Sequence, residues 1–152
     1  MVRLRKVKKG EEKLVFDLVR TVLSDFGLKT DPEGTDHDIS DIYQHYFRRG
    51  GWFSVIEKDG KIIGSYGIYP VNDVICELRK MYLLKEFQGQ GLGRKMMEEA
   101  LSRARELGYT EMILESNTVL KRALALYRKY GFEEYSPEHL SDRCDLTMKR
   151  KI

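Results

Sequence analysis

The sequence predicts a mixed α/β fold in which a central, mostly antiparallel sheet is flanked by helices. Apolar residues alternate with polar ones in several short segments, which is typical of half-buried strands, and recur every three or four residues in others, which is typical of amphipathic helices. The pair Asp59-Gly60 between two apolar segments predicts a hairpin. A later helix leaves the third strand of this region and returns to a new strand, so one parallel pair is expected.

The N-terminal half is expected to contain a strand, two helices and the hairpin. Leu14, Leu18 and Val22 recur at helical spacing, and Gly27 follows as a helix end. The expected elements are a strand at Val2–Val7, a helix at Gly10–Phe26, a loop at Lys29–Thr35, a helix at Asp36–Arg48 with Ile39, Ile42, Tyr43 and Tyr46 on one face, and paired strands at Trp52–Glu57 and Ile62–Tyr69.

The C-terminal half is expected to alternate strands and helices. Its first helix places Met96, Ala100, Leu101 and Ala104 inward, and Gly108 ends it. The expected elements are a strand at Val74–Leu84, a helix at Leu92–Leu107, a strand at Thr110–Glu115, a helix at Leu120–Tyr130, a short strand at Phe132–Tyr135 and a final strand at Arg143–Met148.

Length and composition predict one globular domain spanning residues 1–152. Of these residues, 41% are hydrophobic and 34% are charged. The net charge of +3 is too small to indicate a nucleic acid or a membrane as partner. The first residues lack the apolar core of a signal peptide, and no apolar run is long enough to span a bilayer, so we expect a cytoplasmic protein.

Cysteine and histidine usage predicts no metal site. Cys76 and Cys144 lack the CxxC spacing of zinc ligands, so we expect both thiols to be reduced and buried. His37, His45 and His139 are scattered along the chain, and isolated histidines are usually surface residues. His45 is also a candidate for contact with a substrate.

The segment Gln88–Gly93 predicts an anion site. Its three glycines at alternate positions permit a tight turn with open N–H groups, and a helix begins at once. A helix start offers unpaired N–H donors and the positive end of the helix dipole. The basic residues near this segment in sequence, which suit a polyphosphate, are Arg79, Lys80, Lys85, Arg94 and Lys95.

Three known ligand-binding motifs could account for this segment. A dinucleotide fingerprint needs G-x-G-x-x-G after an opening strand, and a P-loop needs G-x-x-x-x-G-K-[ST]; neither is present. The segment resembles instead the acyl-coenzyme A loop of the GCN5-related N-acetyltransferases, whose signature Gln/Arg-x-x-Gly-x-Gly/Ala matches Gln88, Gly91 and Gly93. The stretch Leu126–Phe132 is similar to the family's Leu-Tyr-x-Lys-x-Gly-Phe, and the element order matches too. A glycine-rich turn without a ligand is the alternative.

The resemblance implies a site for acetyl-coenzyme A. Backbone N–H groups from Gln88 to Arg94 would hold the pyrophosphate, and the pantetheine arm would pair with a strand edge where the parallel strands splay apart. The family often has asparagine at the position of Leu120, and the nearest asparagine here is Asn117. The implied cofactor-binding residues are Met81, Tyr82, Leu83, Gln88, Gly89, Gln90, Gly91, Leu92, Gly93, Arg94, Lys95, Asn117 and Lys129.

The resemblance also implies two catalytic residues for acetyl transfer to an amine. Glu77, eleven residues before Gln88, matches a general base, and the alternative is a simple ion pair with Arg79. Tyr127 matches a general acid for the leaving thiolate, and the alternative is a core role, because it falls on the apolar face of its helix. The backbone N–H of Met81 matches the donor to the acetyl oxygen.

The expected acceptor is a primary amine of a small molecule or a peptide. In this family the acceptor approaches near the first two helices, a region that is acidic and aromatic here and that favours a cation; the residues are Asp36, Asp38, Asp41, Tyr43, Tyr46 and Trp52. The acidic residues, which include Asp31 and Glu33, are alternatively a solvated surface. Asp145 either lines the acceptor site or caps a strand. A non-catalytic acyl-coenzyme A sensor is the alternative function, and the family is often dimeric.

Overall fold

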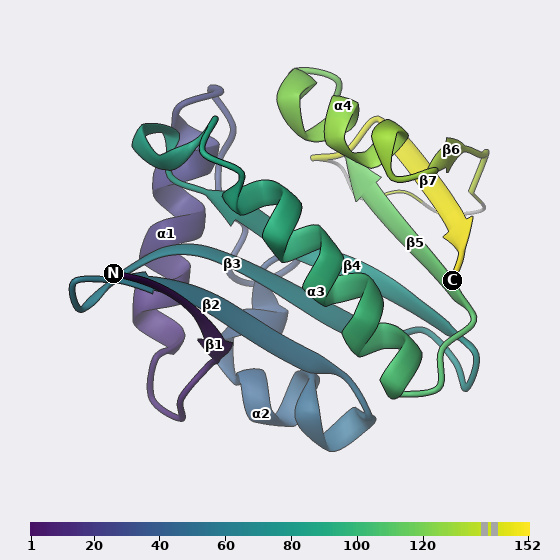
Figure 1. Ribbon diagram of the computed structural model, residues 1–152, viewed down its shortest axis with the longest axis horizontal. Coiled ribbons are helices and arrows are strands. Elements are labelled where there is room, and N and C mark those ends of the chain that lie inside the picture. Colours follow the sequence, from purple (N-terminus) through teal and green to yellow (C-terminus); the bar gives the residue numbers. More distant parts are fainter. Residues whose placement is uncertain (138–139, 141–142) are drawn as a thin grey trace.

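The computed structural model describes residues 1–137, 140 and 143–152, and it forms one central sheet with helices on both faces (Figure 1). Within these residues the strand order is β1-β2-β3-β4-β5-β7-β6, and every neighbouring pair is antiparallel except β4 and β5. The predicted mixed sheet with one parallel pair is therefore confirmed. The elements are β1 Val2–Lys6, α1 Glu12–Ser24, η1 His37–Ser40, α2 Ile42–His45, η2 Phe47–Arg49, β2 Trp52–Lys58, β3 Lys61–Pro70, β4 Ile75–Leu83, η3 Lys85–Phe87, α3 Leu92–Glu106, β5 Glu111–Ser116, α4 Lys121–Lys129, β6 Glu133–Glu134 and β7 Leu146–Lys151.

Strands β2 and β3 form the predicted hairpin, with helices on both faces. Asp59 and Gly60 connect β2 to β3 with φ angles of 51° and 79°, the left-handed values that a type I′ turn requires. In Figure 1, α3 crosses the near face of these strands, whereas α1 and α2 lie behind them. The helices thereby bury both faces of β2, β3 and β4, as their largely buried side chains show.

The first helix differs from the prediction in the face that it buries. Leu14 is 52% exposed, whereas Val15, Val19 and Leu23 are buried together with Leu18 and Val22. The apolar stripe of α1 is thus centred on the next residues along the helix, and the prediction that Leu14 belongs to it is wrong.

The predicted helix at Asp36–Arg48 is broken into three short pieces, η1, α2 and η2. Asp41 is extended, with φ −147° and ψ 89°, and its carboxylate accepts a hydrogen bond from the Gln44 amide at 3.1 Å. A side chain that caps a new helix in this way competes with continuation of the previous one. Ile39, Ile42 and Tyr46 are buried as expected, whereas Tyr43 is only half-buried.

The C-terminal half agrees with the prediction except at its last strand. The inward residues of α3 are confirmed, since Met96, Ala100, Leu101 and Ala104 are all buried. The last strand, β7, begins at Leu146 rather than Arg143 and continues to Lys151. Residues before it are held in a turn instead, because the Asp145 carboxylate accepts hydrogen bonds from the Thr118 amide and hydroxyl. Among the described residues, no helix has both the length and the apolar character needed to cross a bilayer.

Candidate functional site

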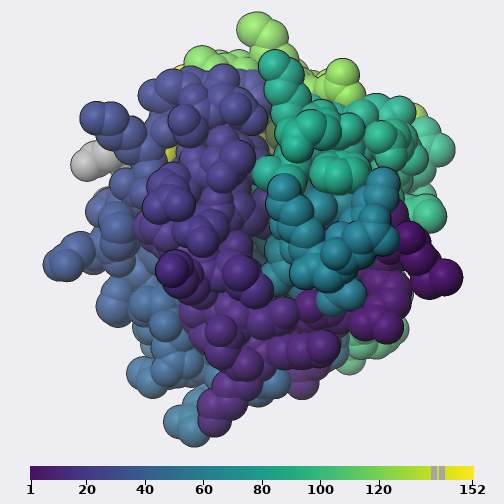
Figure 2. Space-filling view, turned by 90° about the vertical axis from the view of Figure 1, so that its left-hand side faces the viewer, coloured from purple at the N-terminus to yellow at the C-terminus, as the bar shows by residue number. Residues whose placement is uncertain are grey.

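The parallel strands β4 and β5 separate and open a cavity. They pair from Ile75–Glu111 to Glu77–Ile113, and beyond this point β4 has a described ladder partner only in β3. A cavity of about 800 Å³ lies at the opening and is lined from α1, β4, the glycine loop, α4 and the segment before β7. Figure 2 views the side where the purple and indigo surface of α1 and the following loop meets the teal and green surface of the glycine loop. The splayed pair expected from the resemblance is therefore present.

A β-bulge lies in β4 beside this opening. Gly67 pairs with Arg79 but Ser65 pairs with Tyr82, so an extra residue is inserted in β4. Lys80 adopts φ 54°, and its carbonyl accepts a hydrogen bond from the Ser65 hydroxyl at 2.7 Å. The inserted residue turns the Lys80 side chain into the protein, where it is buried. The prediction that Lys80 serves a polyphosphate at the glycine loop is therefore wrong.

Lys80 joins two aspartates in a buried ion network. Its Nζ lies 3.2 Å from Asp36 Oδ1 and 3.2 Å from Asp38 Oδ1, and the Asp36 carboxylate also receives both Nη groups of Arg143, at 2.6 and 2.8 Å. Burial opposes ionisation of Asp36, but Arg143 and Lys80 together lower the pKa of its carboxyl. Asp36 and Asp38 are 1% and 6% exposed. These two aspartates are therefore neither part of a solvated surface nor available to an external cation, and both expectations are wrong for them.

Glu77 occupies the last paired position before the opening and lines the cavity. Arg79 Nε donates to Glu77 Oε1 at 2.9 Å, and Arg79 Nη2 lies 2.9 Å from the same oxygen, whereas Oε2 accepts no hydrogen bond from the described residues. Burial raises the pKa of the Glu77 carboxyl; the charge of Arg79 opposes this rise and that of Glu115 adds to it. The ion pair with Arg79 is therefore real, yet it leaves one carboxylate oxygen available.

Arg79 is itself held in place from the other side. Its guanidinium lies 3.7 Å from the centre of the Tyr69 ring, and its Nη1 lies 3.7 Å from Asp38 Oδ2. The Tyr46 hydroxyl donates a hydrogen bond to the same Asp38 oxygen. The buried ion network thus reaches Glu77 through Arg79 and fixes the orientation of its carboxylate.

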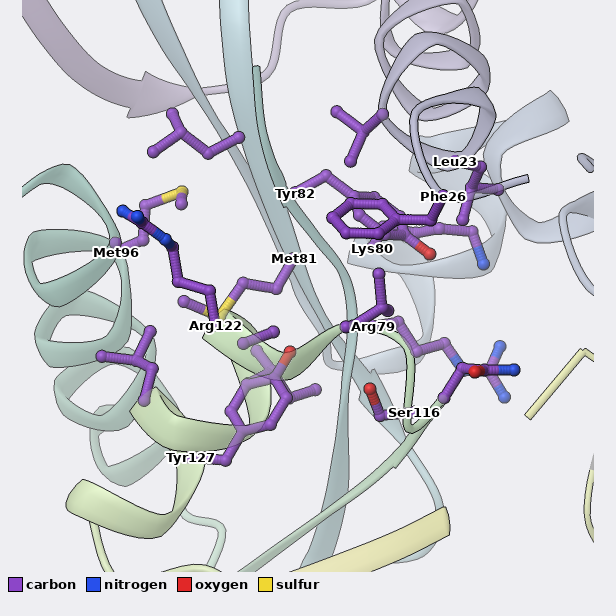
Figure 3. Close-up of a pocket in the computed structure, with 18 of the residues that line it drawn as sticks. Leu23, Phe26, Arg79, Lys80, Met81, Tyr82, Met96, Ser116, Arg122 and Tyr127 are labelled. Atoms are coloured by element: carbon purple, nitrogen blue, oxygen red, sulfur yellow. The ribbon is translucent and has the colours of Figure 1, made fainter. Parts of the chain in front are cut away.

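Tyr127 combines a packed ring with a hydroxyl that faces the cavity. The side chain is 7% exposed, and the ring meets Phe132 edge-on at 5.9 Å between centroids. Figure 3 shows its hydroxyl directed from α4 into the space beside β4 and Met81, and the described residues offer this hydroxyl no hydrogen-bond partner. Burial raises the pKa of Tyr127 further above its ordinary value, so the hydroxyl keeps its proton at neutral pH.

The glycine loop presents a row of free amides. Gly89 and Gly91 have φ angles of 80° and 84°, and among the described residues the amides from Gly89 to Arg94 donate no hydrogen bond. Gln88 Nε2 ties the loop to the Leu83 carbonyl at 3.0 Å. Gly93 lies inside α3, and a Cβ added there would meet Leu126 Cδ2 at an ordinary 3.6 Å, which explains why the signature accepts alanine at this position.

Most of the predicted site residues line the cavity. Those that do are Glu77, Met81, Tyr82, Leu83, Gln88, Gly89, Gly91, Gly93, Arg94, Asn117, Tyr127 and Lys129, whereas Gln90, Leu92 and Lys95 do not. Leu92 is buried in the core, and the Gln90 side chain donates to the Glu86 carbonyl at 3.4 Å. The Asn117 side chain already bonds the Arg143 carbonyl and the Val119 amide, at 2.9 and 3.0 Å.

The cavity is also lined by several residues that the sequence patterns do not predict. Arg122 in the first turn of α4 places Nη1 3.4 Å from the position of a Cβ on Gly89, so it lies beside the glycine loop. Leu23 at the end of α1 and Phe26 in the turn after it form an apolar wall (Figure 3). The motif carries no signal for Arg122, since only the fold brings α4 beside the loop. Arg143 and Cys144 also line the cavity, and the expectation that Cys144 is buried is wrong.

The aromatic part of the expected acceptor region lies elsewhere. Among the described residues, the cavity lining does not include Asp41, His45, Tyr43, Tyr46 or Trp52. Trp52 packs against Phe47 instead, and His37 meets His45 edge-on. The described residues hold no cluster of three or more His, Cys, Asp and Glu side chains suited to a metal ion. His139 lies outside the described residues.

The chain is similar to known acetyltransferases in sequence. A family model described as Acetyltransferase (GNAT) family matches residues 17–132. The chain is 35% identical over 135 residues to the uncharacterized N-acetyltransferase YjgM of Escherichia coli (strain K12). The aligned region covers 86% of this chain and 81% of YjgM. It is 34% identical over 103 residues to N-acetyltransferase 8 of Homo sapiens, covering 64% of this chain but 45% of the human protein.

Solved structures show the same fold. A GNAT-family acetyltransferase from Staphylococcus aureus Mu50 has a TM-score of 0.91 at 18% identity over 99% of both chains. The PaiA N-acetyltransferase from Thermoplasma acidophilum, solved in complex with coenzyme A, has a TM-score of 0.78 at 18% identity over 100% of this chain and 99% of that one. The matched family model, the splayed parallel pair and the glycine loop agree: the chain belongs to the GNAT family of acetyltransferases.

Proposed function

We propose that residues 1–152 act as one N-acetyltransferase domain that moves an acetyl group from acetyl-coenzyme A to a primary amine of a small molecule or peptide, by direct attack in a ternary complex. One observation carries the proposal: within the described part of the chain, a row of amides and a strand edge that have no partner border the same cavity as a buried carboxylate and a buried phenol. The kinship with YjgM, which is named an N-acetyltransferase, and the coenzyme A in the PaiA structure support it.

The residues present fit acetyl-coenzyme A. The amides from Gly89 to Arg94 and the start of α3 offer converging donors for a diphosphate. Arg122 beside the loop adds a positive charge. The β4 edge from Met81 to Leu83 has backbone groups available to a pantetheine arm, which is amide-rich. Bound acetyl-coenzyme A supplies the reaction with an activated acetyl thioester.

The side chains around the opening supply the proton transfers. Glu77 Oε2 accepts a proton from the incoming ammonium, directly or through a water, while Arg79 keeps Oε1 in place. The raised pKa of Glu77 makes it a stronger base than an ordinary carboxylate. By the resemblance to the family, the Met81 amide would donate to the acetyl oxygen and the Tyr127 hydroxyl to the leaving sulfur.

Ligand binding and turnover test this proposal separately. Acetyl-coenzyme A at saturation should raise the melting temperature, because it binds only the folded chain. A panel of small amines and peptides, assayed for release of free thiol, should then give turnover that Glu77→Gln depresses strongly while the thermal shift stays. No thermal shift with wild type would remove the cofactor assignment. A shift without thiol release from any amine would favour the acyl-coenzyme A sensor.

A further inference from the structure

Cys144 is held at the opening of the cofactor cleft by its neighbours. The Arg143 carbonyl accepts a hydrogen bond from Asn117 Nδ2 at 2.9 Å, and the Asp145 amide donates to the Ser116 carbonyl at 3.0 Å. Cys144 is therefore fixed beside the end of β5, half-exposed and lining the cavity. Cys76, the second of the two cysteines, is buried at 0% exposure and does not line the cavity.

The register of the sheet places Cys144 across the cleft from the proposed reaction centre. The last parallel pair joins Glu77 to Ile113. Three residues further along β4 lies Lys80, next to Met81. Three residues further along β5 lies Ser116, whose carbonyl accepts the hydrogen bond from the Asp145 amide. Cys144 thus lines the cavity at the level of β4 where the Met81 amide would meet the acetyl group.

Cys144 lies close to the place where a ligand sulfur is expected. Burial chiefly raises the pKa values of Tyr127 and Tyr82, and Cys144 adds to the rise in both, so it lies near both hydroxyls. Arg143, the preceding residue, interacts electrostatically with Cys144, and its guanidinium is bound to the Asp36 carboxylate. Independently, the Tyr127 hydroxyl points into the same space with no described partner, which indicates a ligand group at that point; under the proposed function, this group is the sulfur of coenzyme A.

We propose that Cys144 is a modification site at which oxidised coenzyme A forms a mixed disulfide that occupies the cofactor cleft and stops acetyl transfer. This inference rests on the proposed function, because the nucleotide must dock on the glycine loop. The Cys144 thiolate attacks one sulfur of the coenzyme A disulfide. The reagent's S–S bond breaks as a new Sγ–S bond forms; the Cys144 sulfur is oxidised, and the second coenzyme A leaves as a reduced thiolate that takes up the proton Cys144 had released.

The test uses the full chain with each cysteine changed separately. Reduced wild type, Cys144→Ser and Cys76→Ala are incubated with coenzyme A disulfide and analysed by intact-protein and peptide mass spectrometry. We expect one coenzyme A adduct on wild type and Cys76→Ala, none on Cys144→Ser, and loss of thiol-release activity in step with the adduct. Dithiothreitol should remove the adduct and restore activity. Glutathione disulfide, which lacks the nucleotide, should react at least roughly tenfold more slowly at equal concentration, because docking raises the effective concentration of the reagent.

Three results would overturn the inference. The first is an adduct that forms on Cys76 or persists in Cys144→Ser. The second is equal rates with coenzyme A disulfide and glutathione disulfide, which is the behaviour of an ordinary exposed thiol. The third is full activity in stoichiometrically modified wild type. The failure of the proposed function has a different signature, since acetyl-coenzyme A would then give no thermal shift with the untreated chain; a normal shift with no adduct refutes only the role of Cys144.

Discussion

Replacing Arg79 by glutamine tests the base role of Glu77 without touching its carboxylate. In the structure, Arg79 lies 2.9 Å from Glu77 Oε1 and holds the pKa of this buried carboxyl below the value that burial alone would give. Removing the guanidinium removes this opposition, so the pKa of Glu77 rises further. Because Glu77 must be ionised to accept a proton, the acid limb of kcat/KM moves to higher pH.

The size of this shift follows from the surroundings of the pair. A cation in contact lowers the pKa of a carboxyl by about 1–3 units. Arg79 retains 28% side-chain exposure, against 10% for Glu77, so solvent screens part of its charge and the lower end of that range applies. We therefore expect the limb to move to higher pH, with a loss of about tenfold in kcat/KM, or 1.4 kcal/mol, on the acid side. Above both limbs, the rates of wild type and variant should converge.

The assay is thiol release over a pH series, with Arg105→Gln as the matched control. Arg105 is exposed on α3 and does not line the cavity, so its loss should leave the profile unchanged. Arg79→Lys should recover part of the shift, and Glu77→Gln should abolish the limb altogether. A limb that stays in place, or moves to lower pH, in Arg79→Gln would show that Glu77 is not the group being titrated.

Three further predictions concern stability, turnover and the glycine loop. Lys80→Met leaves two buried aspartates without their shared cation, which should cost about 3–5 kcal/mol and lower the melting temperature by roughly 6–20 °C; a loss of under ~2 °C in calorimetry would contradict the network. Tyr127→Phe keeps the ring packed on Phe132, so kcat should fall by roughly 10²-fold at an unchanged melting temperature, and wild-type turnover would return Tyr127 to a core role. Gly91→Ala should strain a residue at φ 84° by about 1–2 kcal/mol and weaken acetyl-coenzyme A binding roughly 5- to 30-fold in calorimetry. Gly93→Ala serves as its control, and equal affinities for the two variants would contradict the conformational argument.

Local signals made much of the fold and part of the site predictable. Asp59-Gly60 fixed a hairpin because both residues tolerate positive φ, and the glycines at 89 and 91 marked the loop for the same reason. Tyr127 was found through a motif within one helix. In each case the decisive interaction lies within a few residues along the chain, where spacing and residue type carry the information.

Long-range pairing decided the parts that the sequence did not reveal. Asp36 is buried because Arg143, 107 residues away, binds it with both Nη groups, and no spacing rule connects these two positions. Arg122 lies at the glycine loop only because α4 packs there. Charge clusters read from sequence therefore indicate composition near a site, but only the tertiary pairing determines whether a charge faces a ligand or another side chain.

The bulge at Lys80 links the stability of this region to its chemistry. One extra residue in β4 turns Lys80 inward, where it neutralises Asp36 and Asp38, and Asp38 in turn contacts the Arg79 that holds Glu77. The same insertion interrupts regular alternation next to the Met81 amide, shortly beyond Glu77, the last residue of β4 that pairs with β5. A bulge costs a ladder hydrogen bond and places a non-glycine residue at φ 54°. The buried ion pairs of Lys80 offset this cost. Removing the charge of Lys80 should therefore destabilise the bulge and leave the Glu77 carboxylate less firmly oriented.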